Sequence, residues 1–158
     1  MTPNRAFEMA APISSARLVC LRGGAPLNAK VSSHEMRIFF SPNGSDPMLL
    51  DTKAGLHALH RDLRLFLASS STSGAFPADT AGSPEPYAEF LHGLRLSKGA
   101  GEARLTLAPD RWLVLEGSIS ELERCARKFL IEGEDAHTHL YTAPVSLIIE
   151  AESVWTPE

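Results

Sequence analysis

The pattern of apolar and polar positions is clearest in the C-terminal third of the chain. Residues 104–107 alternate polar and apolar, and residues 112–115 are continuously apolar. Pro109 and Asp110 between them mark a tight turn, so the two segments predict a β-hairpin. The alternation over residues 137–141 and the β-branched run over 146–150 predict two further strands.

A helix is expected between these two pairs of strands. Ser118 is a suitable N-cap, and Glu121 three residues later completes a capping-box pattern. The apolar stripe consists of Leu122, Cys125, Ala126 and Phe129. Glu123 and Arg127 have the spacing of an ion pair on the opposite face, and Gly133 is the expected end.

The same order of elements occurs upstream. Residues 36–40 and 48–50 predict strands joined by the turn Ser41-Pro42-Asn43-Gly44, and Thr52 is placed to cap a helix. Its apolar stripe is Leu56, Leu59, Leu63, Phe66 and Leu67. Strands are also expected at 17–21, 87–91 and 94–96, with a hairpin turn at 98–101.

The repeated order predicts an α+β fold built from two tandem ββαββ-like units, at about 36–98 and 103–152. The expected architecture is a largely antiparallel sheet with two helices packed on one face, in a single domain spanning 16–158. Residues 1–15 are interpreted as a flexible leader. Residues 69–86, rich in serine, glycine and proline, predict a long mobile loop.

Composition narrows the class of partner. The formal net charge of −4 argues against nucleic acid and anionic membranes, which require a basic field. We identify no signal peptide and no apolar stretch of about 20 residues, so a cytoplasmic protein is expected. Two widely spaced cysteines, Cys20 and Cys125, fit buried core positions in a reducing compartment.

Candidate chemistry is sparse. Among the six histidines, His57 and His60 lie one helical turn apart, but the acidic partner of a zinc-protease motif is missing. His34 and His92 are expected near loops. We recognise no nucleophile elbow and no phosphate-binding glycine loop, and we therefore assign no catalytic residue, metal ligand or cofactor.

The strongest candidate for binding is an acidic segment beyond the second helix. Acidic groups at a helix C-terminus oppose the helix dipole, so a solvated turn or a functional role must account for them. In the functional reading, the segment meets a basic partner surface. The candidate partner-binding residues are Glu132, Glu134, Asp135, His137, His139 and Tyr141.

Residues 129–140, followed by the strand at 146–150, resemble the C-terminal part of small α+β immunity proteins, which neutralise bacterial polymorphic toxins. The resemblance extends mainly over residues 118–152. It implies a non-enzymatic inhibitor that occludes a toxin or effector enzyme.

Two alternatives remain open. One is a small-ligand-binding or enzymatic domain with its pocket between sheet and helices. The other is a homodimer formed through a sheet edge.

Overall fold

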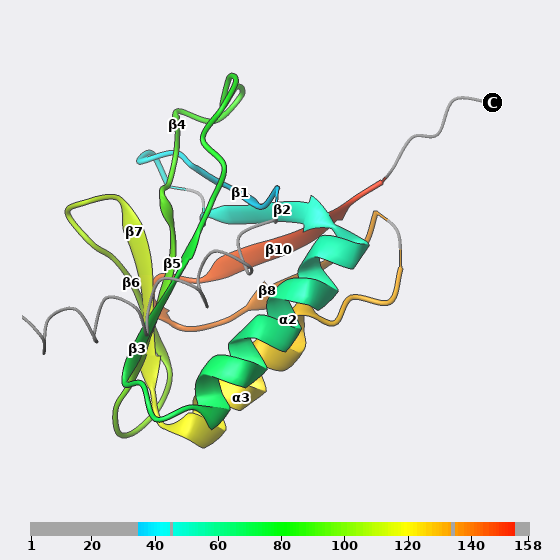
Figure 1. The fold of residues 1–158 in the computed structure, drawn as a ribbon. Helices are drawn as coiled ribbons and strands as arrows, with labels where there is room; N and C mark the ends of the chain where they lie inside the picture. Colours follow the sequence, from blue (N-terminus) through cyan, green and yellow to red (C-terminus); the bar gives the residue numbers. More distant parts are fainter. Residues whose placement is uncertain (1–34, 45, 134, 154–158) are drawn as a thin grey trace, which may run out of the picture. The chain divides into compact units, whose positions relative to one another are not determined.

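In the part of the chain that the structure describes, the strands form two sheets, each of five strands, and two α-helices pack beside them (Figure 1). The structure is a computed structural model that describes residues 35–44, 46–133 and 135–153. The predicted leader at 1–15, the strand at 17–21, Cys20, His34 and Glu134 lie outside these residues. The α+β class and the mainly antiparallel pairing are confirmed, but the single predicted sheet is wrong.

Sheet A has the order β4-β1-β2-β10-β8. Its strands are β4 (Glu89–Phe90), β1 (Arg37–Phe40), β2 (Met48–Thr52), β10 (Leu147–Glu152) and β8 (His137–Leu140). Strands β1 and β2 form the predicted hairpin. Strand β2 pairs in parallel with β10, so the last strand of the fold returns to one of its first.

Sheet B has the order β3-β5-β7-β6-β9. Its strands are β3 (Ser73–Pro77), β5 (Gly93–Lys98), β7 (Trp112–Gly117), β6 (Arg104–Leu107) and β9 (Ala143–Pro144). Strands β6 and β7 form the predicted hairpin, whereas β5 and β6 do not pair because β7 lies between them. The predicted hairpin across residues 98–101 is therefore wrong.

Most strands that follow each helix cross to the hairpin of the other half, whereas β4 and β9 pair with the hairpin of their own half. Strands β3 and β5, which follow the first helix, join the β6–β7 hairpin, and β8 and β10, which follow the second, join β1–β2. Parallel pairing requires a long connection: the connection from β2 to β10 contains both helices, whereas the connection from β5 to β7 contains strand β6. Each half begins with the predicted two strands and a helix, but three strands rather than two follow each helix, so the tandem ββαββ units are not confirmed.

The first helix, α2 (Lys53–Ala68), begins where its cap predicts, since Thr52 Oγ1 accepts a hydrogen bond from Gly55 N at 3.0 Å. The second, α3 (Ile119–Ala126), begins after Ser118, whose Oγ accepts from Glu121 N at 3.3 Å. The side chain of Glu121 binds Arg124 at 2.7 Å.

The second helix ends earlier than predicted. After Ala126 the chain forms one 3₁₀ turn, η2 (Arg127–Phe129), and Gly133 lies in the loop beyond. Two histidines of α2 bind carbonyls at this end: His60 Nδ1 lies 2.9 Å from Ala126 O, and His57 Nε2 lies 3.0 Å from Ile131 O. Side chains of the neighbouring helix thus replace the next helical turn. The predicted Glu123–Arg127 pair does not form, because Arg127 already belongs to the 3₁₀ turn.

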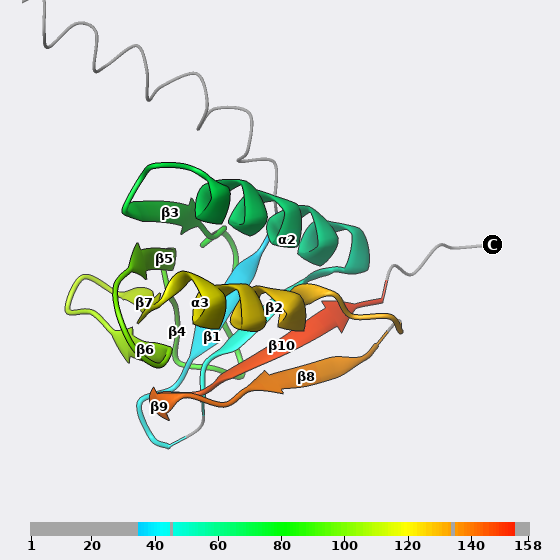
Figure 2. The same ribbon diagram turned by 90° about the horizontal axis from the view of Figure 1, so that it is seen from below.

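Both helices lie on the inner side of the sheets, and the apolar core fills the space between (Figure 2). The inward side chains of sheet A, including Ile38, Leu49 and Ile149, are fully buried together with Leu56 of α2 and Phe129 of η2. In the central strand β7, Leu113 and Leu115 are buried while Trp112 and Val114 are half-buried, so only one face of this strand is fully covered.

The serine-rich segment predicted as a loop contains a strand. Its single large apolar side chain, Phe76, is buried, and β3 pairs with β5 along the edge of sheet B. An edge strand packs few side chains against the core, so small and polar residues suffice in β3. Its sequence therefore lacks the alternation of apolar and polar residues that predicts a strand. Strand β4, by contrast, is shorter than the predicted strand at 87–91.

Replacing Phe129 by alanine should destabilise the protein by about 3–5 kcal/mol, because its ring is fully buried among the helices and sheet A. Urea denaturation followed by circular dichroism measures this loss. The neighbouring Leu130→Ala, at a side chain that is 41% exposed, is the control and should cost about 1 kcal/mol or less. Equal losses for the two variants would contradict the packing described.

Gly55→Ala should destabilise the protein, although this change stabilises an ordinary helix interior by about 0.5–1 kcal/mol. A Cβ at Gly55 would overlap the carboxylate of Asp51, which is buried and whose Oδ1 accepts from Thr52 N at 2.7 Å. We expect a loss of about 1–3 kcal/mol in urea denaturation.

A double-mutant cycle isolates this overlap. In an Asp51→Ala background the same Gly55→Ala change should become neutral or stabilising. If Gly55→Ala stabilises the protein with Asp51 intact, the overlap is not a constraint.

Candidate functional site

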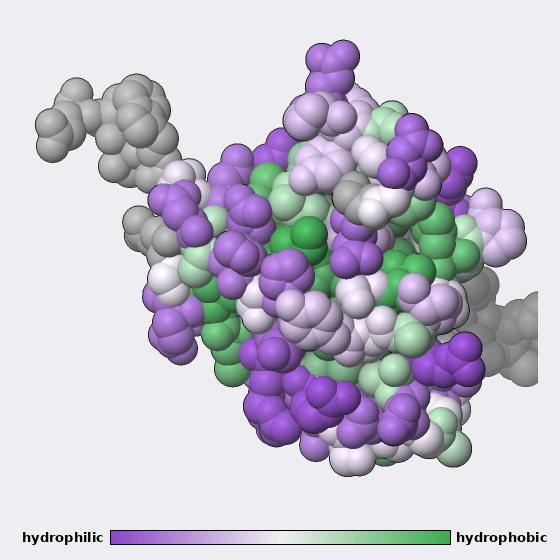
Figure 3. Space-filling model, turned by 180° about the vertical axis from the view of Figure 1, so that it is seen from behind, coloured by the Kyte–Doolittle hydropathy of each residue, from purple (hydrophilic) through white to green (hydrophobic). Residues whose placement is uncertain are grey.

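The face of sheet A that points away from the helices carries a continuous row of apolar and aromatic side chains. The strand registers place these residues opposite one another across all five strands. We call them the outer row, and in spatial order they are Phe90, Phe39, Met48, Ile148 and His139. Hydrophobic atoms accordingly gather in the middle of this face, between polar side chains (Figure 3).

Aromatic contacts support one end of the outer row. The ring of Phe39 lies 5.1 Å from Phe90 and 5.2 Å from Tyr87 between ring centroids, which leaves Phe39 only 6% exposed. The hydroxyl of Tyr87 donates to Met48 Sδ at 3.5 Å. Phe90, Met48 and Tyr87 remain half-buried, so this end offers a preformed apolar surface.

A ladder of three rings forms the other end. His139 lies 5.5 Å from His137 in an edge-to-face arrangement and 5.4 Å from Tyr141, with which it is stacked at 8°. These residues alternate along β8 and its extension and therefore share one face. Tyr141 is 74% exposed, which makes it the most accessible aromatic anchor of the described residues.

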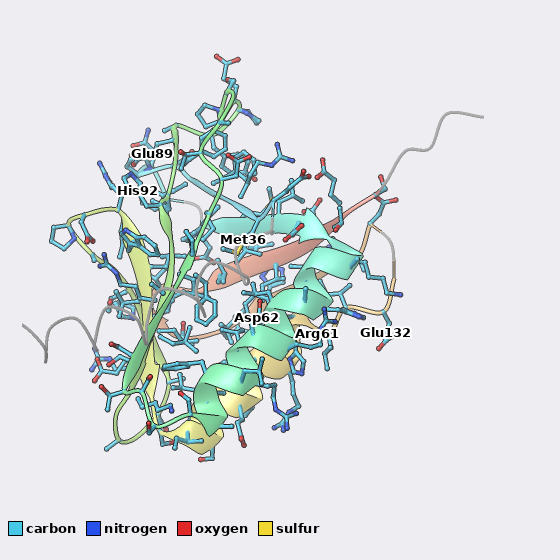
Figure 4. The ribbon with its side chains drawn as sticks, viewed as in Figure 1. Met36, Arg61, Asp62, Glu89, His92 and Glu132 are labelled. Atoms are coloured by element: carbon cyan, nitrogen blue, oxygen red, sulfur yellow. The ribbon has the colours of Figure 1, made fainter. Side chains whose placement is uncertain are left out.

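Carboxylates lie beside this ladder. Glu150 of β10 is opposite His137, and Glu132 and Asp135 are exposed in the loop that leads into β8. Figure 4 shows the Glu132 side chain directed away from the ribbon, while its backbone carbonyl accepts from Lys53 Nζ at 2.6 Å. No ion pair joins these three carboxylates to a cation of the described residues.

The structure brings most of the sequence-predicted binding residues together. His137, His139 and Tyr141 form the ladder, and Glu132 and Asp135 flank it, whereas Glu134 lies outside the described residues. Sequence reasoning missed Phe39, Met48 and Ile148, which join the site only through the strand register. The sequence signal for these residues is an apolar residue directly beside a core residue in the same strand, because neighbouring strand residues face opposite sides. Examples are Phe39 beside the core residue Ile38 and Ile148 beside the core residue Ile149.

His57, His60 and Cys125 have structural roles. His57 and His60 bind the carbonyls after α3, as described above. Within the described residues no cluster of three or more histidine, cysteine or acidic side chains is arranged to hold a metal. Cys125 is fully buried, as predicted, and burial raises the pKa of its thiol.

Trp112 of β7 is half-buried under a charged side chain. The guanidinium of Arg95 lies 4.6 Å from its ring centroid and binds Asp110 at 2.7 Å. Gly93 lies against the ring so closely that a Cβ there would overlap it. The hydrogen bond from Arg95 also lowers the pKa of Asp110.

A groove of about 690 Å³ runs beside α3 and β6. Its lining residues are Ala100, Glu102, Ala103, Arg104, Glu121, Arg124, Tyr141, Thr142 and Ala143. They do not include the contacting histidine and carboxylate that the ligand-binding alternative would favour, and the pair Glu121–Arg124 binds internally. This contact lowers the pKa of the Glu121 carboxyl.

None of the helices in the described ranges is both long and apolar enough to span a membrane. Comparison with family models, with curated proteins and with solved structures found no match to this chain.

Proposed function

We propose that this protein is a non-enzymatic binding module of the immunity type, which inhibits a toxin or effector enzyme by covering its active site. The outer row is the observation that carries the proposal. In a sheet with one face in water, the residues that alternate with the core positions are commonly polar. Here one row across the outward face is apolar on four strands of sheet A and ends in His139 on the fifth, with Arg37 and Glu150 on the same face beside it.

The preformed geometry of the outer row supports recognition without rearrangement. Ring contacts at both ends hold Phe39 and His139 in place, tilted against Phe90 and stacked on Tyr141, so little side-chain entropy is lost when a partner docks. The carboxylates of Glu132, Asp135 and Glu150, which form no ion pair with a described residue, favour a partner with basic groups around its apolar contact.

Size limits what the outer face can do alone. The five strands of sheet A have two to six residues each, and at about 3.3 Å per residue and about 4.8 Å between strands they present a flat area of about 330 Å². A stable protein interface buries about 800 Å² on each partner. The module must therefore also use surfaces beside the outer row, of which the β8 side carries the exposed Tyr141 and the carboxylates.

Two substitutions test the proposal. Ile148→Glu places a charge in the middle of the outer row, and Tyr141→Ala removes the exposed anchor. The tagged wild-type protein should recover a partner from a lysate of its host, and adding it in equal amount should inhibit the purified partner's activity. Each variant should weaken binding at least tenfold in calorimetry, as removal of an interface anchor does.

Leu65→Ala is the matched control, since Leu65 is 69% exposed but lies on α2, away from the outer row. Its binding should equal that of the wild type, and thermal melting should confirm that all three variants fold. A recovered partner that binds Ile148→Glu and Tyr141→Ala as tightly as wild type would reject the outer row. A recovered partner whose activity the wild-type protein does not inhibit would contradict the inhibitor role.

A further inference from the structure

Strand β8 leaves one side of its backbone open. Ala136 O accepts from Ala151 N at 2.9 Å, so Ala136, Thr138 and Leu140 direct their backbone groups toward β10. The alternating residues His137 and His139 therefore direct their N–H and C=O groups toward the free edge of sheet A. Among the described residues no strand pairs with that edge.

This edge lacks the usual protection against strand pairing. Of the four outermost strands of the two sheets, β4 and β9 are two residues long, and β3 ends in Pro77. Strand β8 has four residues and contains neither proline nor lysine, the residues that commonly block an edge. Within the described ranges, the outward backbone groups of His137 and His139 thus have no strand partner.

The charges around β8 select the kind of strand that fits. From Phe129 to Glu158 the sequence contains no lysine or arginine. The same stretch has six acidic residues, Glu132, Glu134, Asp135, Glu150, Glu152 and Glu158. The cations nearest to these groups are Lys53, which donates to the Glu132 carbonyl, and Arg37, which pairs with Glu152. A second copy of β8 and its flanking residues would still bring an excess of carboxylates, so pairing between copies is disfavoured.

We propose that β8 accepts an extended segment of a partner protein as an additional strand of sheet A, and that this segment alternates basic and apolar residues. Its backbone pairs with His137 and His139, its apolar side chains extend the outer row past the His139–Tyr141 stack, and its basic side chains approach Asp135 and Glu132. The inference rests on the proposed function and names its mode of binding. An added strand also supplies contact area that the outer face alone lacks.

The test uses the full-length protein and a fluorescein-labelled synthetic peptide of ten alternating valine and lysine residues. Two control peptides separate backbone from charge. In one, alternate amides are N-methylated, which keeps the charge but removes the backbone donors, and in the other glutamate replaces lysine. Fluorescence anisotropy should show saturable binding of the first peptide, with at least tenfold weaker binding of both controls.

Two substitutions at one position supply the matched protein pair. His139→Pro removes an outward N–H and leaves the bonds between β8 and β10, since proline is tolerated where the N–H faces solvent. His139→Ala removes the ring and keeps the N–H. Binding of the valine–lysine peptide should fall at least tenfold for His139→Pro and less for His139→Ala. When the same peptide binds the wild type, hydrogen exchange should slow at the His137 and His139 amides.

Charge is tested with Asp135→Asn, because asparagine tolerates the left-handed backbone at Asp135, where φ is 54°. It should weaken binding about threefold to tenfold, while Asp79→Asn, on the exposed segment after β3, should not. No binding by the wild type, equal binding of the N-methylated peptide, or equal binding of the glutamate peptide would overturn strand addition. The comparison of the three peptides still tests the proposal if His139→Pro fails to fold.

The same variants separate this inference from the proposed function. If Ile148→Glu and Tyr141→Ala abolish inhibition of the recovered partner but His139→Pro does not, strand addition is wrong and the binding module stands. If none of the three changes inhibition, both are wrong.

Discussion

The parallel pairing of β2 with β10 is the constraint on which the rest of the structure depends. It joins residues about a hundred positions apart, from Met48↔Ile148 to Thr52↔Glu152. Because β10 occupies the position beside β2, its antiparallel neighbour β8 becomes the edge of sheet A. The same pairing sets Met48 beside Ile148 and so completes the outer row. The core, the candidate site and the free edge thus follow from one strand pairing.

The helix layer holds this arrangement by polar contacts as well as by apolar packing. His57 and His60 of α2 bind the carbonyls of Ile131 and Ala126, which would otherwise be unsatisfied where α3 ends. Lys53 Nζ binds the carbonyl of Glu132 in the next part of the loop. Since this loop leads directly into β8, the first turns of α2 fix the position from which the ring ladder starts.

Local signals in the sequence predicted local structure well. Thr52 and Ser118 cap the helices, the two hairpins form, and the alternation at 137–141 identified the ladder of β8. Strand partners could not be predicted in the same way, because β5 pairs with β7 and β2 with β10 through contacts distant in sequence. The end of α3 was missed for a similar reason, since histidines of another helix terminate it.

The acidic flanks of β8 have two opposite effects, and together they explain how an open edge persists. An exposed edge strand promotes association between identical chains, and proteins commonly use charge to prevent it. Asp135 and Glu132 repel a second copy, whose C-terminal stretch is equally acidic, yet attract a basic segment. A neutral or apolar flank would bind any strand, and a lysine within β8 would hinder pairing with copies and basic partners alike. Carboxylates beside an unblocked backbone therefore combine protection from self-association with selectivity for one class of partner.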